Sequence, residues 1–198
     1  MPTIKNICVY CGSSPGKHEA YAAAARHLAD SLVTRNIGLV YGGASIGIMG
    51  AVADQVLARG GRVIGVIPKA LSQQEVAHAH LTELHVTATM HERKMLMAEL
   101  ADGFIAMPGG IGTLEELFEI WTWAQLGFHN KPIGLLNVAG YYDKLLDFLA
   151  HMHQEQFFKT QHRELLIVEN SSSELLERFS HYQKHTLPVT GLHKEDLA

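Results

Sequence analysis

The chain has 198 residues, of which 47% are hydrophobic and 18% are charged, and its formal net charge is −4. This composition supplies enough apolar side chains for one folded domain and lacks the charge excess of a disordered chain. The negative charge and the scattered Lys and Arg residues exclude a general nucleic-acid binder, which usually carries a basic stripe. No apolar run reaches the ~18–20 residues of a membrane span, and no basic leader is visible, so we expect a soluble, cytoplasmic protein.

Short apolar stretches alternate with helical patterns along the chain. Strands are predicted at residues 4–11, 38–41, 62–67, 85–86, 103–107, 132–136 and 165–168. Helices are predicted at residues 19–34, 48–58, 92–100, 114–126, 142–154 and 173–182. This alternation indicates a doubly wound, Rossmann-like α/β fold with a mostly parallel sheet and helices on both faces. We expect one catalytic domain over residues 1–185, followed by an aperiodic tail over residues 186–198.

Three glycine-containing loops follow predicted strands, which is where open parallel sheets bind their ligands. Residues 11–16 and 41–50 form the first two, and neither contains the full dinucleotide fingerprint or the P-loop pattern. A standard NAD site and a P-loop nucleoside triphosphatase are therefore disfavoured. The glycines of the second loop fit strand–helix packing and ligand contact about equally well; they are Gly42, Gly43, Gly47 and Gly50.

The third loop is the longest motif of the chain and reads Met107-Pro108-Gly109-Gly110-Ile111-Gly112-Thr113-Leu114-Glu115-Glu116. Its glycines let the backbone approach a ligand closely, and the start of the following helix attracts an anion. The sequence therefore predicts a phosphate site with two carboxylates in the first turn of the helix. A carboxylate beside an anion site indicates chemistry on a phosphorylated substrate rather than on the phosphate itself.

Two cations, Arg93 and Lys94, lie at the start of the preceding helix, where the helix dipole disfavours them. A guanidinium can hold a phosphate or orient a carboxylate through two parallel hydrogen bonds, and an ammonium adds a compact charge. The alternative is a solvated helix face on which these cations pair with Glu92 or another acid.

Glu116 also has two interpretations. The residues from Thr113 to Glu116 fit the Ser/Thr-x-x-Glu capping box, in which the acid closes the helix start. The presence of Arg93 and of the glycine loop favours a catalytic carboxylate instead. Because a helix start favours the charged form of a carboxyl group, we expect Glu116 to be a stabiliser or base rather than a proton donor.

The cysteine and histidine patterns predict neither a redox site nor a metal site. Cys8 and Cys11 have redox-type spacing, but they lie in an apolar strand and their odd offset points them to opposite faces, which favours structural thiols. The two His-x-His pairs, at residues 78–80 and 151–153, lack an acidic or cysteine partner at ligand distance.

The third loop matches Pro-Gly-Gly-x-Gly-Thr-x-x-Glu, with Glu92-Arg93-Lys94 upstream at the fitting spacing. With residues 11–13, 41–43, 75–78 and 122–127, these motifs resemble the Lonely Guy (LOG) family of cytokinin-activating nucleoside 5′-monophosphate phosphoribohydrolases, long mislabelled as lysine decarboxylases. The resemblance covers most of the chain. One departure is Ala44, which stands where the family usually has a third glycine and would narrow the loop if that position needs positive φ.

The resemblance implies a reaction and a set of site residues. The enzyme would hydrolyse the N-glycosidic bond of AMP or of an N6-modified cytokinin riboside monophosphate, with Arg93 and Glu116 as the catalytic pair. An ionised carboxylate would stabilise the positive charge that develops on the ribose and would activate water. The substrate-binding positions implied are Glu75, Arg93, Lys94, Gly109, Gly110, Ile111, Gly112, Thr113, Leu114, Glu115 and Thr122. For Glu75 and Thr122, a surface charge and a helix-packing hydroxyl remain equally good interpretations.

The resemblance further implies a nucleotide substrate, no cofactor, no metal and a homodimer, and the nearly all-apolar helix around Leu117 and Trp121 suits a subunit interface. A non-catalytic nucleotide or cofactor carrier on the same scaffold is the alternative, since it would not need Arg93 and Glu116 together. A pyridoxal-phosphate decarboxylase would need a Schiff-base lysine in a larger domain, which nothing in the sequence supplies. The preferred base and the cellular role, hormone production or nucleotide salvage, stay open at this level.

Overall fold

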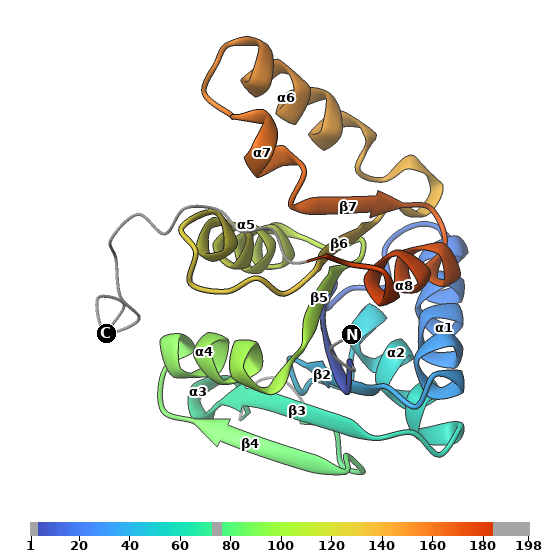
Figure 1. Cartoon of the computed structure of the whole chain (residues 1–198). Coiled ribbons are helices and arrows are strands. Elements are labelled where there is room, and N and C mark those ends of the chain that lie inside the picture. Colours follow the sequence, from blue (N-terminus) through green and yellow to red (C-terminus); the bar gives the residue numbers. More distant parts are fainter. Residues whose placement is uncertain (1–3, 73–76, 184–198) are drawn as a thin grey trace.

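The computed structural model describes residues 4–72 and 77–183, and within these ranges the strands form one seven-stranded sheet (Figure 1). The strands are β1 (Asn6–Tyr10), β2 (Gly38–Tyr41), β3 (Val63–Pro68), β4 (Glu83–Thr87), β5 (Gly103–Ala106), β6 (Ile133–Leu136) and β7 (Leu166–Glu169). Their order is β4-β3-β2-β1-β5-β6-β7, and each neighbouring pair is parallel. Because the strand order reverses between β1 and β5, the loops after these two strands flank the crevice in which such sheets bind ligands.

Helices cover both faces of the sheet, as predicted. One layer holds α1 (Glu19–Thr34), α2 (Gly47–Ala58) and α8 (Ser172–Ser180), at the right of Figure 1. The other layer holds α4 (Met90–Leu100), α5 (Ile111–Gln125) and α6 (Asp143–Gln154). Three short helical segments, α3 (Lys69–Ser72), η1 (Val138–Gly140) and α7 (Thr160–Arg163), lie in the connections.

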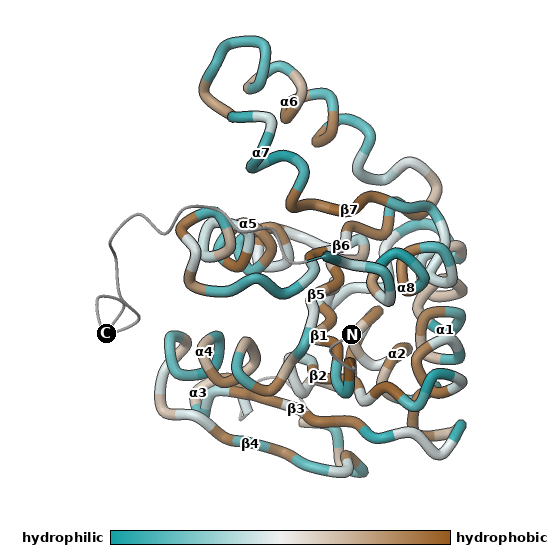
Figure 2. The backbone as a smooth tube through the Cα atoms, in the orientation of Figure 1, coloured by the Kyte–Doolittle hydropathy of each residue, from teal (hydrophilic) through white to brown (hydrophobic). Residues whose placement is uncertain are grey.

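The core consists of two apolar layers separated by the sheet; most strands are hydrophobic along their length, whereas the edge strand β4 alternates between hydrophilic and hydrophobic residues (Figure 2). Successive residues of β1 alternate between them: Ile7 and Val9 pack under α1 and α2, whereas Cys8 and Tyr10 pack under α4 and α5. Cys11 returns to the first layer, so the prediction of two thiols on opposite faces is confirmed. Both cysteines are free and buried, and burial raises the pKa of each thiol, which makes them inert structural residues.

The predicted elements are all present, with differences at their ends. The helix of the third loop begins at Ile111, three residues earlier than predicted, and the helix of Arg93 begins at Met90, two residues earlier. The short segments α3, η1 and α7 were not predicted. The predicted tail over residues 186–198 lies outside the described residues. In the ranges that the structure describes, no helix is both long and apolar enough to cross a membrane.

Candidate active site

The first turn of α5 is an open helix start at the crevice between β1 and β5. Its N-cap is Gly110, which has no side chain to occupy the free N–H groups of the first turn. A Cβ atom built at Gly110 or at Gly112 would meet no atom within 4 Å, so there is space above this turn. Gly109 is different, because a Cβ there would overlap Thr113, which is itself buried. The turn therefore presents backbone donors to open space, as an anion site requires.

The start of α2, in contrast, is closed. The N–H groups of Ile48 and Met49 donate to the Gly12 carbonyl at 3.0 and 3.3 Å. Gly47 has φ +59°, and a Cβ there would overlap the Ser13 backbone. The other three glycines of this loop, Gly42, Gly43 and Gly50, also face atoms of the protein. The glycines of the second loop are thus closely packed in this structure, and of these two helix starts only that of α5 is open.

Arg93 and Glu116 meet beneath the open start of α5. Arg93 Nη1 lies 3.4 Å from Glu116 Oε1, and the two side chains are only 11% and 12% exposed. Arg93 Nε donates to the carbonyl of Val66 in β3, at 3.1 Å. A Cβ at Gly42 would overlap Arg93 Nη2, so the missing side chain at the end of β2 makes the space that the guanidinium occupies. The predicted pairing of these two residues is observed.

Burial controls the charge of Glu116. It raises the pKa of this carboxyl group to about 7, although the charge of Arg93 acts in the opposite direction. Glu115 and Glu119 add to the rise, and Lys94 opposes it. The expectation that the helix start keeps Glu116 ionised was wrong, because desolvation outweighs both the dipole and the ion pair at this position.

Glu116 is not part of a capping box. Helix α5 begins at Ile111, so Thr113 is its third residue and Glu116 its sixth, and the first turn contains no acid. The prediction of two carboxylates in the first turn was therefore also wrong; Glu115 and Glu116 lie in the second turn. This shift removes the capping interpretation and leaves the Glu116 carboxylate available for other chemistry.

The start of α4, in contrast, is capped by side chains. Thr89 Oγ1 accepts a hydrogen bond from the Glu92 N–H at 3.1 Å, and Glu92 Oε2 accepts one from the Ala88 N–H at 2.8 Å. These bonds close the start of α4 and hold the turn that carries Arg93. Glu92 thus has a local structural partner and does not pair with Arg93 in this arrangement.

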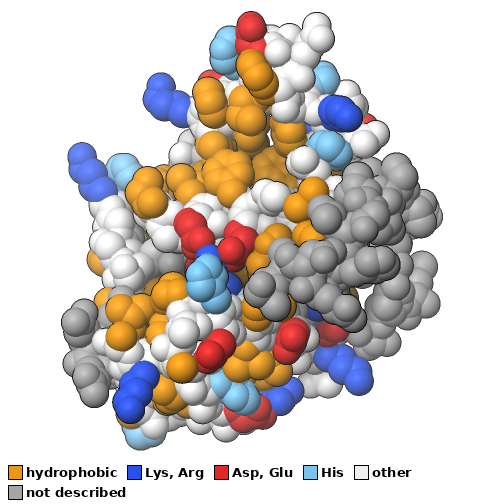
Figure 3. All heavy atoms as spheres, turned by 90° about the vertical axis from the view of Figure 1, so that its left-hand side faces the viewer, with side chains coloured by type: hydrophobic (Ala, Val, Ile, Leu, Met, Phe, Trp, Pro, Cys, Tyr) orange, Lys and Arg blue, Asp and Glu red, His pale blue; other side chains and the backbone are white. Residues whose placement is uncertain are grey.

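Lys94 joins α4 to α5 through two acids. Its Nζ donates to Glu115 Oε1 at 2.6 Å and to Glu119 Oε1 at 2.8 Å, and its side chain is 12% exposed. Burial lowers the pKa of Lys94, but these hydrogen bonds outweigh it and the pKa is raised. Acidic side chains gather on the face formed by α4 and α5, below a band of hydrophobic side chains (Figure 3). The predicted site residues Lys94 and Glu115 are therefore one ion-pair unit beside Glu116.

The remaining predicted residues are spread around α5. Leu114 packs on the apolar layer under α5, and Ile111 is 82% exposed. Thr122 is exposed, donates to the Phe118 carbonyl at 2.7 Å, and lies roughly 9 Å along the helix axis from Glu116. Within one chain it is not brought to the Arg93–Glu116 pair. Glu75 lies outside the described residues.

Ala44 does not narrow the second loop. It is fully buried and is not among the residues with positive φ, and it forms an isolated antiparallel bridge with Ala77. The left-handed conformation of this loop falls on Gly43, at φ +80°.

His78 of the first His-x-His pair contacts Asp54 at 2.9 Å. In the described part of the chain, no three His, Cys, Asp or Glu side chains come together as metal ligands do.

Several residues of the site were not predicted. The Val66 carbonyl, Glu119, and the tyrosines Tyr141 and Tyr142 each bond to a predicted site residue or to the third loop. Val66 acts through its backbone, which carries no sequence signal. The tyrosines follow β6, and their position at the carboxyl end of a strand neighbouring β5 was the signal that could have identified them.

The fold has solved counterparts among molybdenum cofactor proteins. The Moco carrier protein of Chlamydomonas reinhardtii matches with a TM-score of 0.66 and 21% identity, over 89% of this chain and 96% of that one. The molybdenum cofactor binding protein of Rippkaea orientalis matches with a TM-score of 0.68 and 19% identity, over the same shares. At such identities the likeness concerns the fold alone.

Similarity in sequence is much greater to plant enzymes. The family model described as "Possible lysine decarboxylase" matches residues 49–179. The cytokinin riboside 5′-monophosphate phosphoribohydrolase LOG4 of Arabidopsis thaliana is 51% identical over 176 residues, covering 89% of this chain and 82% of that protein. The probable cytokinin riboside 5′-monophosphate phosphoribohydrolase LOGL6 of Oryza sativa subsp. japonica is 49% identical over 178 residues, covering 90% of this chain and 71% of that protein.

The fold and the site define an α/β protein with an open helix start on α5 and a buried arginine–glutamate pair between α4 and α5. The chain belongs to the LOG family of cytokinin riboside 5′-monophosphate phosphoribohydrolases, the family whose model carries the older decarboxylase description.

Proposed function

We propose that the protein hydrolyses the N-glycosidic bond of a nucleoside 5′-monophosphate and releases a free base and ribose 5-phosphate. The substrate is AMP, an N6-modified cytokinin riboside monophosphate, or both. The observation that carries this proposal is the buried Arg93–Glu116 pair directly below the open first turn of α5. Membership of the LOG family supports the same reaction.

The spacing of α5 suits a phosphorylated sugar. The phosphate binds at the free N–H groups of the first turn, and Glu116 follows five residues after Ile111, roughly 7–8 Å along the axis. The phosphate thus acts as a handle that holds the glycosidic carbon near the carboxylate. The binding residues of this proposal are Glu75, Arg93, Lys94, Gly109, Gly110, Ile111, Gly112, Thr113, Leu114, Glu115 and Thr122.

The chemistry of the pair follows from its charges. Breaking the glycosidic bond develops positive charge on the ribose, and ionised Glu116 stabilises that charge and orients an attacking water. A pKa of about 7 lets Glu116 also accept a proton from that water near neutral pH. Arg93 holds the carboxylate in place and offsets part of its desolvation cost.

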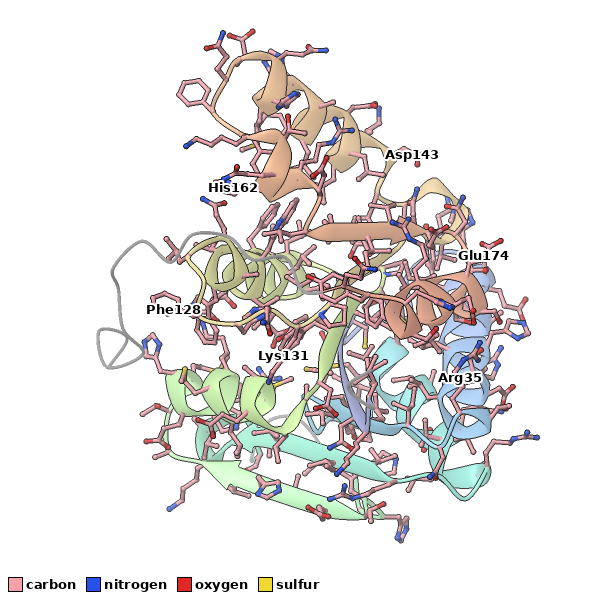
Figure 4. The ribbon with its side chains drawn as sticks, in the orientation of Figure 1. Arg35, Phe128, Lys131, Asp143, His162 and Glu174 are labelled. Carbon is pink, nitrogen blue, oxygen red and sulfur yellow. The ribbon has the colours of Figure 1, made fainter. Side chains whose placement is uncertain are left out.

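We also propose that the protein is a homodimer and is cytoplasmic. Ile111 and Phe118 are exposed apolar side chains on α5, and the exposed Glu115 and Thr122 lie on the same side of this helix. A cleft of about 250 Å³, lined in part by Trp123 of α5, lies between α4 and the segment of Phe128 and Lys131 (Figure 4). A second copy would cover these apolar side chains, and Thr122 on the same side of α5 would then reach a ligand across the interface. The two free, buried cysteines suit a reducing compartment.

The decisive experiment is an assay of purified protein with AMP and with its N6-isopentenyl analogue, followed by chromatography of the products. Stoichiometric free base and ribose 5-phosphate are expected from the better substrate, and the ratio of the two kcat/KM values identifies the preferred base. Nucleotide binding without release of base would refute hydrolysis and favour the non-catalytic carrier. Adenosine, which lacks the phosphate, is the matched control and should react far more slowly.

A further inference from the structure

Two consecutive tyrosines from the connection after β6 hold the loop that precedes α5. The Tyr142 hydroxyl donates to the Met107 carbonyl at 2.6 Å, and the Tyr141 hydroxyl donates to the Gly109 carbonyl at 2.6 Å. Between them, the Pro108 carbonyl accepts from the Gly12 N–H at 3.1 Å. Three successive carbonyl oxygens of the loop are therefore each bonded to a donor from outside it.

The connection itself is built to present these two hydroxyls. Ala139 and Gly140 both have left-handed backbone conformations, at φ +51° and +69°, which turn the chain sharply after β6. Asn137 then fixes the turn: its Oδ1 accepts from the Tyr142 N–H at 2.8 Å and its Nδ2 donates to Asp143 at 2.7 Å. Asp143 lies where the connection enters α6, above the sheet in Figure 4. A left-handed non-glycine residue is costly, so the surrounding bonds must hold this turn in place.

The two rings differ in burial, which separates their roles. Tyr142 is 2% exposed and belongs to the core, so its bond also supports the fold. Tyr141 is 43% exposed and packs edge-to-face on Tyr21 and on Tyr142, with ring centroids 5.6 and 4.8 Å apart. The hydroxyl of Tyr141 therefore contributes little to the core, and its bond to Gly109 acts mainly on the loop.

Two of these bonds determine where amide N–H groups of the loop point, whereas the bond from Tyr142 orients only the Met107 carbonyl, because the next residue, Pro108, has no N–H. A trans peptide unit is planar, so its N–H points opposite to its carbonyl. When Tyr141 holds the Gly109 oxygen on one side, the Gly110 N–H must point to the other side. The bond from Gly12 to Pro108 fixes the Gly109 N–H in the same way. A free carbonyl oxygen facing the ligand would repel a phosphate, whereas a fixed N–H attracts it.

We propose that Tyr141 and Tyr142 are positioning residues that turn the carbonyl groups of residues 107–109 away from the 5′-phosphate and preorganise the loop to bind it. This inference rests on the proposed function, since it takes the ligand of the α5 start to be the phosphate of the substrate. Neither tyrosine needs to touch the substrate, because each acts through the peptide units of the loop.

The test compares phosphorylated and unphosphorylated ligands in Tyr141→Phe. We expect KM for AMP and the inhibition constant of ribose 5-phosphate to rise together by roughly five- to tenfold, with kcat within about twofold. Inhibition by adenosine, which lacks the phosphate, should be unchanged. Tyr142→Phe should likewise weaken the binding of AMP and ribose 5-phosphate but not of adenosine, and it should also lower the thermal stability. Tyr41→Phe is the matched control, because the buried Tyr41 hydroxyl has no partner among the described residues.

Equal weakening of phosphorylated and unphosphorylated ligands, or no change in either, would overturn the inference. A fall in kcat with KM and the inhibition constant unchanged would overturn it as well. If the wild-type protein binds AMP but releases no base, the proposed function fails while this inference is still measured by the dissociation constants of AMP and ribose 5-phosphate. The two failures are thus distinguishable.

Discussion

Glu116 shows how burial changes the chemistry of a single carboxyl group. A buried site opposes its ionisation, and the guanidinium of Arg93 only partly compensates. The result is a carboxyl group with a pKa of about 7, which both gains and loses a proton near neutral pH. Such a group is suited to act as a base and as a charge stabiliser within one reaction cycle.

Substitution of the pair should abolish hydrolysis without unfolding the protein. We expect Glu116→Gln and Arg93→Ala each to lower kcat by at least ~100-fold, because each removes a charge positioned for the transition state. Steady-state release of base from AMP measures this loss, and circular dichroism checks the fold. Near-full turnover by either folded variant would contradict the assignment.

The raised pKa of Glu116 also predicts a dependence of stability on pH. In the unfolded chain a glutamate titrates near ~4.3, and in the native state Glu116 titrates at about 7. Between these values the native state binds more protons, so this group contributes stability at low pH that is lost as the pH rises through 7. Relative to the wild type, the melting temperature of Glu116→Gln should therefore rise by several degrees between about pH 5 and about pH 8.

Thermal melts of both proteins at matched ionic strength measure this difference. The exposed Glu155→Gln serves as the control for removal of a carboxylate. A difference in melting temperature that is constant across this pH range would show that Glu116 titrates normally in the folded protein.

Substitution of Gly42 by alanine should reduce activity because it displaces the Arg93 side chain. The added methyl group of Gly42→Ala would occupy the position of Arg93 Nη2 and push the guanidinium away from Glu116. We expect kcat for AMP to fall by roughly 100-fold, similar to the loss from Arg93 itself. Gly103→Ala is the control for adding a methyl group to a strand. Gly103 lies in β5, its Cβ would be 3.1 Å from Pro132, and the variant should remain active. A fully active Gly42→Ala would mean that the guanidinium can move without cost.

At the level of elements, the site depends on how α4 and α5 are joined. Arg93 and Lys94 on α4 reach Glu116, Glu115 and Glu119 on α5, so adjacent residues of one helix make two separate ion-pair units with the other. Hydrogen bonds of Thr89 and Glu92 cap the start of α4 and fix the position at which this helix begins. The start of α5 has no such cap.

Lys94 is expected to stabilise this helix pair. Lys94→Met leaves two acids without their shared cation, and we expect the free energy of unfolding to fall by about 1–2 kcal/mol. Denaturant unfolding of Lys94→Met, Glu119→Gln and the double variant gives the coupling energy between the two side chains. If Lys94 also binds the nucleotide, KM for AMP will rise in Lys94→Met and not in Glu119→Gln. The absence of any coupling would contradict the ion pair.

For the whole molecule, the exposed apolar side chains of Ile111 and Phe118 on α5 predict self-association. Light scattering should give twice the chain mass of 21.8 kDa. Phe118→Asp replaces an exposed apolar side chain by a charge and should yield a monomer with a reduced kcat/KM, because Glu116 lies on the helix of the proposed interface. Val86→Asp, at the far edge strand β4, should leave the mass unchanged. A monomeric wild type would refute the dimer.

Much of the fold was predictable from local patterns, and the site was predictable in part. Continuous apolar strands and periodic helices identified the parallel sheet, since burial on both faces requires such sequences. The pairing of Arg93 with Glu116 followed from motif spacing and family resemblance. The start of α5 did not, because Gly110, Ile111 and Gly112 are weak helix formers and Thr113 imitates a cap. The hydrogen bond from the Leu114 N–H to the Gly110 carbonyl shows that the helix begins earlier.

The sequence by itself determined the class of fold, the glycine loop and the identity of the two charged partners, because these depend on periodicity and on residue type. Only the tertiary structure decided which helix start is open, how far Glu116 is desolvated, and which backbone carbonyls and tyrosine hydroxyls hold the site. These features arise from contacts between residues far apart in the chain. Their energies depend on burial and on the direction of backbone groups, neither of which a local sequence pattern records.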